Sequence, residues 1–68
     1  MLMMIKGNTT GEVCVLDYRP EGDAKQTRSA WIPANWYDAP LEDFNLDYDA
    51  DDIDPNDGNW TILRQDEE

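Results

Sequence analysis

The acidic residues of this chain are concentrated in its second half. Residues 1–37 contain four acids and four bases, which cancel, whereas residues 38–68 contain twelve acids and one base, Arg64. Twelve minus one accounts for the whole net charge of -11. We expect a charge-neutral β scaffold over residues 1–37 and an acidic half, with a last strand and a frayed tail, over residues 38–68.

The length of the chain excludes large enzymes and multidomain folds. A chain of 68 residues forms one small domain and buries only about 60% of the surface that its unfolded form exposes. The apolar share of 40%, with three Trp and three Tyr, is too high for a uniformly disordered acidic tail. We therefore expect a single folded domain with a marginal core.

The first half predicts an antiparallel three-stranded meander. Residues 2–6 form an apolar run, and the Gly and Asn of residues 7–11 are typical of a hairpin connection. Residues 12–18 predict a strand, and the nearly continuous apolar run at residues 13–16 indicates that it is either covered on both sides or central in a small sheet. Pro20 and Gly22 mark a turn, and residues 28–32 predict a third strand that ends at Pro33.

The second half predicts one short helix and further strands. Asp38 as the capping residue and Pro40 in the first turn predict a helix near residues 39–44. Residues 43–51 alternate between acidic or polar and apolar types, which favours a strand, although the spacing of Leu41, Phe44 and Tyr48 leaves a helix open for residues 45–50. Residues 54–59 predict a loop and residues 60–63 a last strand. The expected fold class is α+β, a small antiparallel sheet of three to five strands with one short helix.

The chain has few residues that could carry catalysis. It contains no His, and its single Cys, Cys14, lies between Val13 and Val15, where burial would raise the thiol pKa. A lone Cys excludes a disulfide framework, and neither a signal-peptide core nor a membrane span is present. We expect a protein of the reducing cytoplasm that is not an enzyme and has no cofactor.

The acids before Gly58 are of the type found in the calcium loop of EF-hands. That loop needs oxygen ligands at positions 1, 3 and 5, Gly at 6 and Glu at 12. With Gly58 at position 6, Ile53 takes position 1 and Arg64 position 12. With Asp52 at position 1, Leu63 takes position 12. Both registers fail, so no metal site is expected.

The alternating segment predicts a nucleic-acid-like row of charge. If it is a strand, carboxylates at 47, 49 and 51 project at a spacing of about 6.8 Å. Each DNA strand carries one charge per about 3.4 Å, and acids on flanking turns could make up the difference. The charge surplus also exceeds the roughly 2–8 charges that solubility requires in a small domain. A fixed acidic row of this kind fits a basic nucleic-acid-binding groove.

Aromatic residues are the other candidate contacts. Trp31 and Trp60 are expected in the core, and the pair Trp36 and Tyr37 at the surface next to the acidic half. The predicted partner-binding residues are Asp38, Glu42, Asp43, Asp47, Asp49, Asp51, Asp52, Asp54, Asp57, Trp36 and Tyr37.

The small size, the acidity, the lack of catalytic residues and the stretch DYDADDID at residues 47–54 resemble small phage-encoded inhibitors that imitate DNA, of the anti-CRISPR and anti-restriction type. The resemblance is one of character, and no residue role is taken from it. It implies a stoichiometric inhibitor in the host cytosol that occupies the DNA- or RNA-binding groove of a basic protein or complex, such as a host defence complex. We expect no direct binding to nucleic acid or membranes, and a monomer or small homo-oligomer. The alternative is an acidic adaptor that recruits a basic partner without blocking nucleic acid.

Overall fold

The computed structural model describes residues 1–19, 24–27, 32–50 and 52–66. Five strands form one antiparallel sheet in the order β4-β3-β2-β1-β5. The strands are β1 (Leu2–Gly7), β2 (Val13–Asp17), β3 (Lys25–Gln26), β4 (Tyr48–Asp49) and β5 (Trp60–Gln65). Two 3-10 turns, η1 (Ala34–Trp36) and η2 (Leu41–Asp43), lie between β3 and β4 in the chain. The predicted antiparallel sheet is confirmed, with five strands.

The β1–β2 hairpin forms the centre of the sheet. Its register runs from Leu2 opposite Asp17 to Lys6 opposite Val13. The connection is closed by the Gly7 amide, which donates to the Glu12 carbonyl at 2.8 Å. A Cβ on Gly7 would lie 2.6 Å from Thr10 Oγ1, so a larger residue at this position would displace the Thr10 side chain. The hairpin is where the sequence predicts it.

Residues of β2 alternate between the two faces of the sheet, and both faces are covered. Val13 and Val15 pack on one face, Cys14 and Leu16 pack on the other, and all four side chains are buried. The continuous apolar run therefore does form a central strand covered on both sides.

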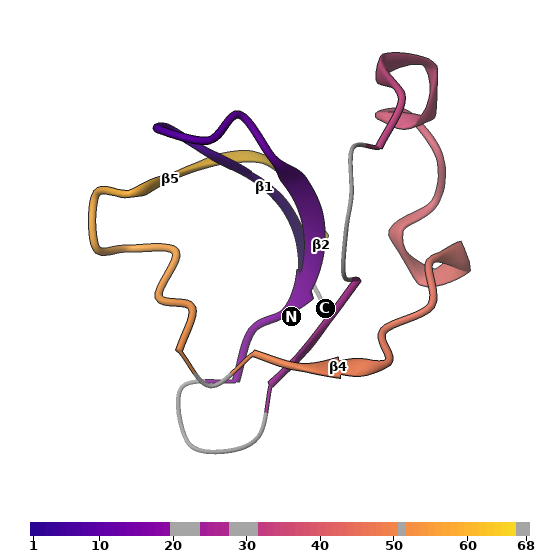
Figure 1. Ribbon diagram of the computed structural model, residues 1–68. Helices are drawn as coiled ribbons and strands as arrows, with labels where there is room; N and C mark the ends of the chain where they lie inside the picture. Colours follow the sequence, from indigo (N-terminus) through magenta and orange to yellow (C-terminus); the bar gives the residue numbers. More distant parts are fainter. Residues whose placement is uncertain (20–23, 28–31, 51, 67–68) are drawn as a thin grey trace.

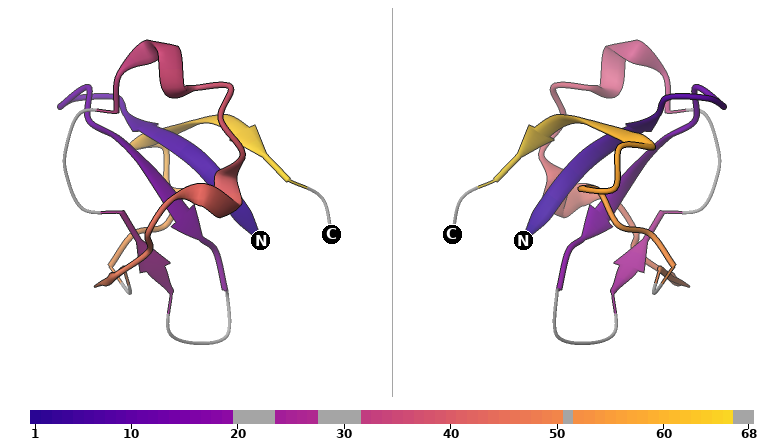
Figure 2. Two further views of the ribbon diagram at one scale, coloured as in Figure 1. Left: turned by 90° about the vertical axis from the view of Figure 1, so that its right-hand side faces the viewer. Right: turned by 90° about the vertical axis from the view of Figure 1, so that its left-hand side faces the viewer.

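Each face of the sheet carries its own core. The inner core consists of Met3, Ile5, Cys14, Leu16, Ala24 and Ala50, with Tyr18, Ile53 and Trp60 packed against it. The outer core consists of Met4, Val13, Val15 and Leu41, with Leu2, Ile32, Tyr37, Phe44 and Leu46 packed against it. Figure 1 shows the strands as an arc, with residues 32–47 on its outer side and residues 52–59 on its inner side. In the two side views, residues 32–47 cross in front of the strands on one side and residues 52–59 lie on the other (Figure 2).

The helix predicted near residues 39–44 is wrong in type and extent, and the class is a β-sheet with 3-10 turns over the described residues. Only η2 forms there, and Pro40 rather than Asp38 stands at its start, without a side-chain cap. Phe44 already has extended backbone angles, φ -85° and ψ 139°. Phe44 and Leu46 both pack on the outer core. Residues two apart share a face in an extended chain but not in a helix, so the turn ends before Phe44.

The third strand of the meander lies earlier in the chain than predicted. It is β3, next to β2, and residues 28–31 of the predicted strand, including Trp31, lie outside the described residues. The pairing with β2 continues at Thr27, whose amide donates to the Val15 carbonyl while its Oγ1 accepts from the Val15 amide, both at 2.9 Å. Because these contacts are made by polar groups, no pattern of apolar residues in the sequence indicates them.

Within the described part of the alternating segment, residues 43–50, only Tyr48 and Asp49 form a strand, and residues 45–50 contain no helix. Its apolar residues do not share a face, because Phe44 and Leu46 pack on the outer core whereas Ala50 packs on the inner core. Tyr48 is 47% exposed. The segment therefore passes the edge of the sheet from one face to the other.

The last strand is confirmed and is longer than predicted. β5 reaches Gln65 and pairs with β1, and the Asp66 amide donates to the Leu2 carbonyl at 3.0 Å. Trp60 is half-buried against the inner core, as expected. The predicted frayed tail is thus ordered through Asp66, and residues 67–68 lie outside the described part of the chain.

Candidate functional site

Residues 38–47, named here the acidic segment, carry four exposed carboxylates across the outer core. They are Asp38, Glu42, Asp43 and Asp47. None of the four forms an ion pair with a lysine or arginine of the described residues. Their charges are therefore not neutralised by the described part of the domain.

Apolar side chains hold the acidic segment on the sheet. Leu41 is fully buried among Met4, Val13 and Val15, and Phe44 and Leu46 are half-buried on the same core. Because apolar anchors lie between the acids, the backbone that carries the carboxylates is held against the sheet. The segment is thus not a solvated tail.

Arg64 of β5 fixes the start of the acidic segment. Its guanidinium Nη1 donates to the carbonyl of Tyr37 at 2.8 Å and to that of Ala39 at 2.6 Å. Its side chain is only 33% exposed, and Nη2 lies 4.0 Å from the Asp66 carboxylate. Arg64, the one base of residues 38–68, therefore binds the backbone carbonyls of the residues before and after Asp38.

A β-bulge places Arg64 on the correct face. Ile5 pairs with Ile62, but Met4 pairs with Arg64, so Leu63 is an extra residue on β5. In a regular ladder Leu63 would pair with Met4 and Arg64 with Met3, and Arg64 would then share the inner face with Trp60 and Ile62, since alternate residues of a strand face the same side. The bulge turns Arg64 toward the outer core, where the acidic segment lies.

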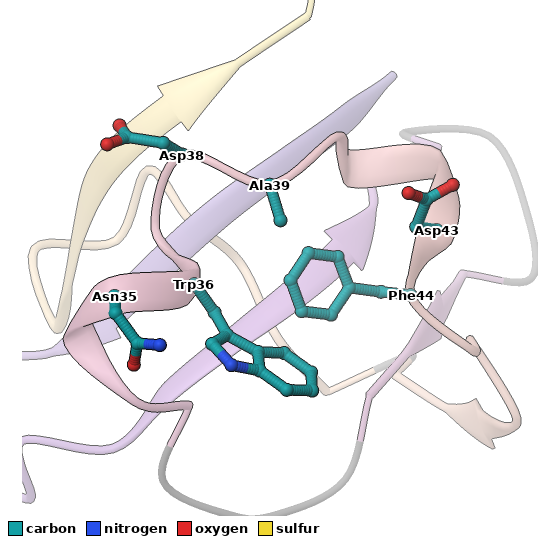
Figure 3. A pocket seen from close by; sticks show the side chains of 6 residues that line it. All are labelled: Asn35, Trp36, Asp38, Ala39, Asp43 and Phe44. Atoms are coloured by element: carbon teal, nitrogen blue, oxygen red, sulfur yellow. The ribbon is translucent and has the colours of Figure 1, made fainter.

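A pocket of about 490 Å³ opens beside the acidic segment. It is lined by Asn35, Trp36, Asp38, Ala39, Asp43 and Phe44. The Trp36 and Phe44 rings lie at its centre, with centroids 6.3 Å apart and planes tilted by 54°. Asp38 and Asp43 stand on either side of the two rings (Figure 3).

The predicted aromatic pair divides into an exposed and a half-buried member. Trp36 is 52% exposed, as expected, and it lines the pocket. Tyr37 is half-buried against the outer core. Tyr37 contributes its carbonyl to Arg64 rather than a side chain to the exposed surface.

The predicted row at residues 47, 49 and 51 is not a free row of charge. Asp49 is paired with Lys25 across the β3–β4 ladder, and the hydrogen bond and charge of Lys25 lower the pKa of Asp49. Asp51 lies outside the described residues. Of the three, Asp47 alone is a described carboxylate without an ion pair to a described base.

The remaining predicted acids lie on the inner side of the sheet. Asp52 is exposed, and Asp54 and Asp57 accept the amides of Asn56 and Asn59, each at 2.9 Å. These short-range bonds shape the loop before β5. The structure therefore separates these acids from the acidic segment, which lies on the outer side (Figure 1).

Cys14 is not available as a nucleophile. Its side chain is 2% exposed within the inner core, and burial, with a smaller effect from the charge of Glu12, raises the pKa of the Cys14 thiol to about 12. The thiolate is the reactive form, and it is not populated near neutral pH.

The described residues form neither a metal-binding cluster nor a membrane-spanning helix. No three His, Cys, Asp or Glu side chains within the described ranges gather closely enough to hold a metal ion. No helix in the described part of the chain has the length and apolar character needed to cross a membrane.

The sequence analysis missed the roles of Arg64 and Phe44. Arg64 is noticeable in the sequence as the single base among the acids of residues 38–68. Nothing local in the sequence connects it to residues 37–39, because the bulge and the β1–β5 register bring them together. Comparison with protein-family models, curated proteins and solved structures finds no match to the chain.

Proposed function

We propose that this protein is a stoichiometric inhibitor that occupies the positively charged DNA- or RNA-binding groove of a basic partner protein. The observation that carries the proposal is the acidic segment: Asp38, Glu42, Asp43 and Asp47 are exposed, lack ion pairs with described bases and are anchored to a sheet. A host defence complex is the class of partner that the resemblance to phage-encoded DNA mimics implies.

Preorganisation supports this function. A groove that binds a nucleic acid backbone offers bases at fixed places, and a flexible acidic tail loses conformational entropy when it orders there. Burial of Leu41 and the two bonds from Arg64 restrict the acidic segment before it meets a partner. Ordering of the acidic segment on binding therefore costs less free energy than ordering of a flexible tail would.

The net charge supports a fast encounter with a basic partner. A charge of -11 on 68 residues produces a long-range field that steers association, and salt screens this field beyond about 8 Å at physiological ionic strength. Rim charges of this kind act mainly on the association rate. Binding to the partner should therefore weaken steeply as salt rises.

A binding role agrees better with the residues than catalysis does. The chain has no His, its one thiol is buried with a raised pKa, and the carboxylates of the acidic segment are exposed. General acid-base catalysis by carboxylates usually depends on burial that separates their pKa values. We therefore propose no reaction for this protein.

Capture followed by competition tests the proposal. The chain, immobilised through a C-terminal tag, is exposed to nuclease-treated host lysate, and the bound proteins are identified. We expect a nucleic-acid-binding protein that double-stranded DNA or RNA releases from the chain, and that the chain in turn displaces from nucleic acid. A captured partner that binds the chain and nucleic acid together would contradict the inhibitor and support the adaptor.

Matched charge variants locate the binding face. Asp38→Asn, Asp43→Asn and Asp47→Asn together remove three charges from the acidic segment. Asp52→Asn, Asp54→Asn and Asp57→Asn remove three from the inner side, and Asn keeps the acceptor oxygen that shapes that loop. We expect only the first variant to lose capture. Equal losses in both would show that the total charge matters and not the acidic segment.

A further inference from the structure

We infer that the pocket around Trp36 is an anchoring site for an arginine side chain of the basic partner. The inference rests on the proposed function for the partner being a basic protein. Beyond that function, the inference names the chemical group of the partner that is recognised and the residues of this protein that recognise it.

The first observation is the exposed aromatic pair. Trp36 is 52% exposed although Trp is a large apolar residue, and its indole lies next to the Phe44 ring at a centroid distance of 6.3 Å. An indole face attracts a cation through its quadrupole more strongly than a Tyr or Phe ring does. A planar guanidinium can also stack on such a ring, which an ammonium cannot do.

The second observation is the charge at the ends of the pocket. Asp38 and Asp43 flank the rings, and no base lines the pocket among the described residues. The carboxylates would attract a cation and repel a phosphate or another acidic chain. A guanidinium stacked on the indole still has N–H groups in its plane, and these can bind an Asp38 or Asp43 carboxylate that turns toward them.

The third observation is the shape of the pocket. Its volume of about 490 Å³ exceeds what a guanidinium alone requires, and Ala39 and Phe44 provide apolar surface for the methylene groups of the side chain. Arginine combines an apolar stem with a charged head. Both parts of the side chain therefore find matching surface.

The fourth observation is that the pocket is held by the fold. Arg64 binds the carbonyls on both sides of Asp38, and the adjacent turn η2 is anchored by the buried Leu41. Because Arg64 is bound to the backbone carbonyls of Tyr37 and Ala39, its guanidinium does not line the pocket. Arg64 is a positioning residue for this site.

Nuclear magnetic resonance of the full chain with basic peptides tests the inference. The probes are peptides of alternating arginine and glycine, matched peptides with lysine, and matched peptides with uncharged citrulline. The indole N–H signal of Trp36 is identified as the one that is lost in Trp36→Phe. We expect the arginine peptide to shift this signal, the lysine peptide to bind more weakly and the citrulline peptide to have no effect.

Variants of the chain separate the pocket from general charge attraction. Trp36→Ala should weaken binding of the arginine peptide about fivefold or more, and Trp36→Phe should have an intermediate effect. Asp38→Asn with Asp43→Asn should weaken binding more than Asp52→Asn with Asp54→Asn, which removes the same charge from the inner side. Trp36 is half exposed, so these substitutions should leave the fold intact, which the spectra themselves verify.

Several outcomes would overturn the inference. Equal binding of the arginine and lysine peptides, an unchanged affinity of Trp36→Ala, or an equal shift by citrulline would each exclude an arginine site. Loss of binding in both pairs of Asp variants, with the Trp36 signal unmoved, would also exclude it. In that last case the displacement of nucleic acid by the acidic protein could still hold, so the failure of this inference is distinguishable from failure of the proposed function.

Discussion

Burial of two single residues, Cys14 and Leu41, determines the reactivity of the thiol and the anchoring of the acidic segment. Cys14 is nearly inaccessible, and its environment consists of apolar side chains of the inner core. The same burial that stabilises the strand keeps the thiol protonated. On the outer face, Leu41 has a comparable position, because it is the one fully buried residue of the acidic segment.

Cys14 should make the domain less stable at alkaline pH. The pKa of the Cys14 thiol is about 12 in the folded state against 9.0 for an unperturbed thiol, so the folded state keeps its proton where the unfolded state releases it. This contribution to stability is complete below pH 9.0 and falls above it, by at most about 1.4 kcal/mol per pH unit, until pH about 12.

Urea unfolding of the wild type and of Cys14→Ala across this pH range measures the effect. The difference between their free energies of unfolding should shrink as pH rises, because only the wild type loses the contribution of the Cys14 thiol. Titration of Tyr and Lys is common to both proteins and cancels in the difference. A constant difference would show that Cys14 does not titrate on unfolding in this range.

Leu41→Ala should destabilise the domain by about 2–5 kcal/mol, because it removes a fully buried side chain and leaves a cavity. A domain of this size has a total stability of roughly 3–10 kcal/mol, so a substantial unfolded fraction is expected. Thermal unfolding followed by circular dichroism measures it. Ile62→Ala, at a site that is 39% exposed, is the control and should cost much less; similar losses would show that Leu41 is not an anchor.

At the scale of secondary-structure elements, the bulge in β5 connects the sheet to the acidic segment. One extra residue, Leu63, changes the face on which Arg64 projects. The two carbonyls that Arg64 binds belong to residues 37 and 39, which precede η2. The edge strand β5 thus positions residues 37–39, which belong to the connection between β3 and β4 at the other edge of the sheet.

Arg64→Met should loosen the segment around Asp38. Two charged hydrogen bonds are lost at a side chain that is about one third exposed, so we expect a loss of about 1–3 kcal/mol of stability, together with a shift of the Trp36 indole N–H signal. Arg19→Met removes an exposed base that is paired with Asp17, and it should change neither quantity appreciably. An unmoved Trp36 signal in Arg64→Met would contradict the positioning role.

At the scale of the whole molecule, the charge is divided between two sides of the sheet. Residues 38–47, which carry four carboxylates, lie on the outer side, and residues 52–57, which carry three, lie on the inner side (Figure 1). Both groups repel within a domain whose net charge is -11, which lowers the stability of the compact state.

Removing charge from the acidic segment should therefore stabilise the protein. Asp38→Asn, Asp43→Asn and Asp47→Asn together should raise the melting temperature by roughly 2–6 °C at low salt, with little effect at high salt. Differential scanning calorimetry measures the difference. Asp49→Asn is the control, because it removes a charge that is already paired with Lys25 and should not stabilise. A fall in the melting temperature of the triple variant would mean that these carboxylates make internal bonds.

Calcium should leave the melting temperature nearly unchanged. Both EF-hand registers fail, and Asp54 and Asp57 use carboxylate oxygens to bind the amides of their own loop. A micromolar site at millimolar calcium would add about 4 kcal/mol, and each kcal/mol shifts the melting temperature by about 4–8 °C. Melting with calcium and with a chelator, at constant ionic strength, tests this; a shift above roughly ten degrees would establish a specific site.

The sequence by itself determined the central hairpin, the covered strand β2, the last strand and the segregation of charge. These features follow from local patterns, because the period of a strand and the residues of a turn are read from neighbours in the chain. The tertiary structure decided which carboxylates are neutralised, why residues 41–43 form only a 3-10 turn and what Arg64 does. Lys25 meets Asp49 across 24 residues, and Arg64 meets the Tyr37 carbonyl across 27. Such contacts depend on strand register, on one bulge and on the side of the sheet that each segment covers, and none of these is set by residues adjacent in sequence.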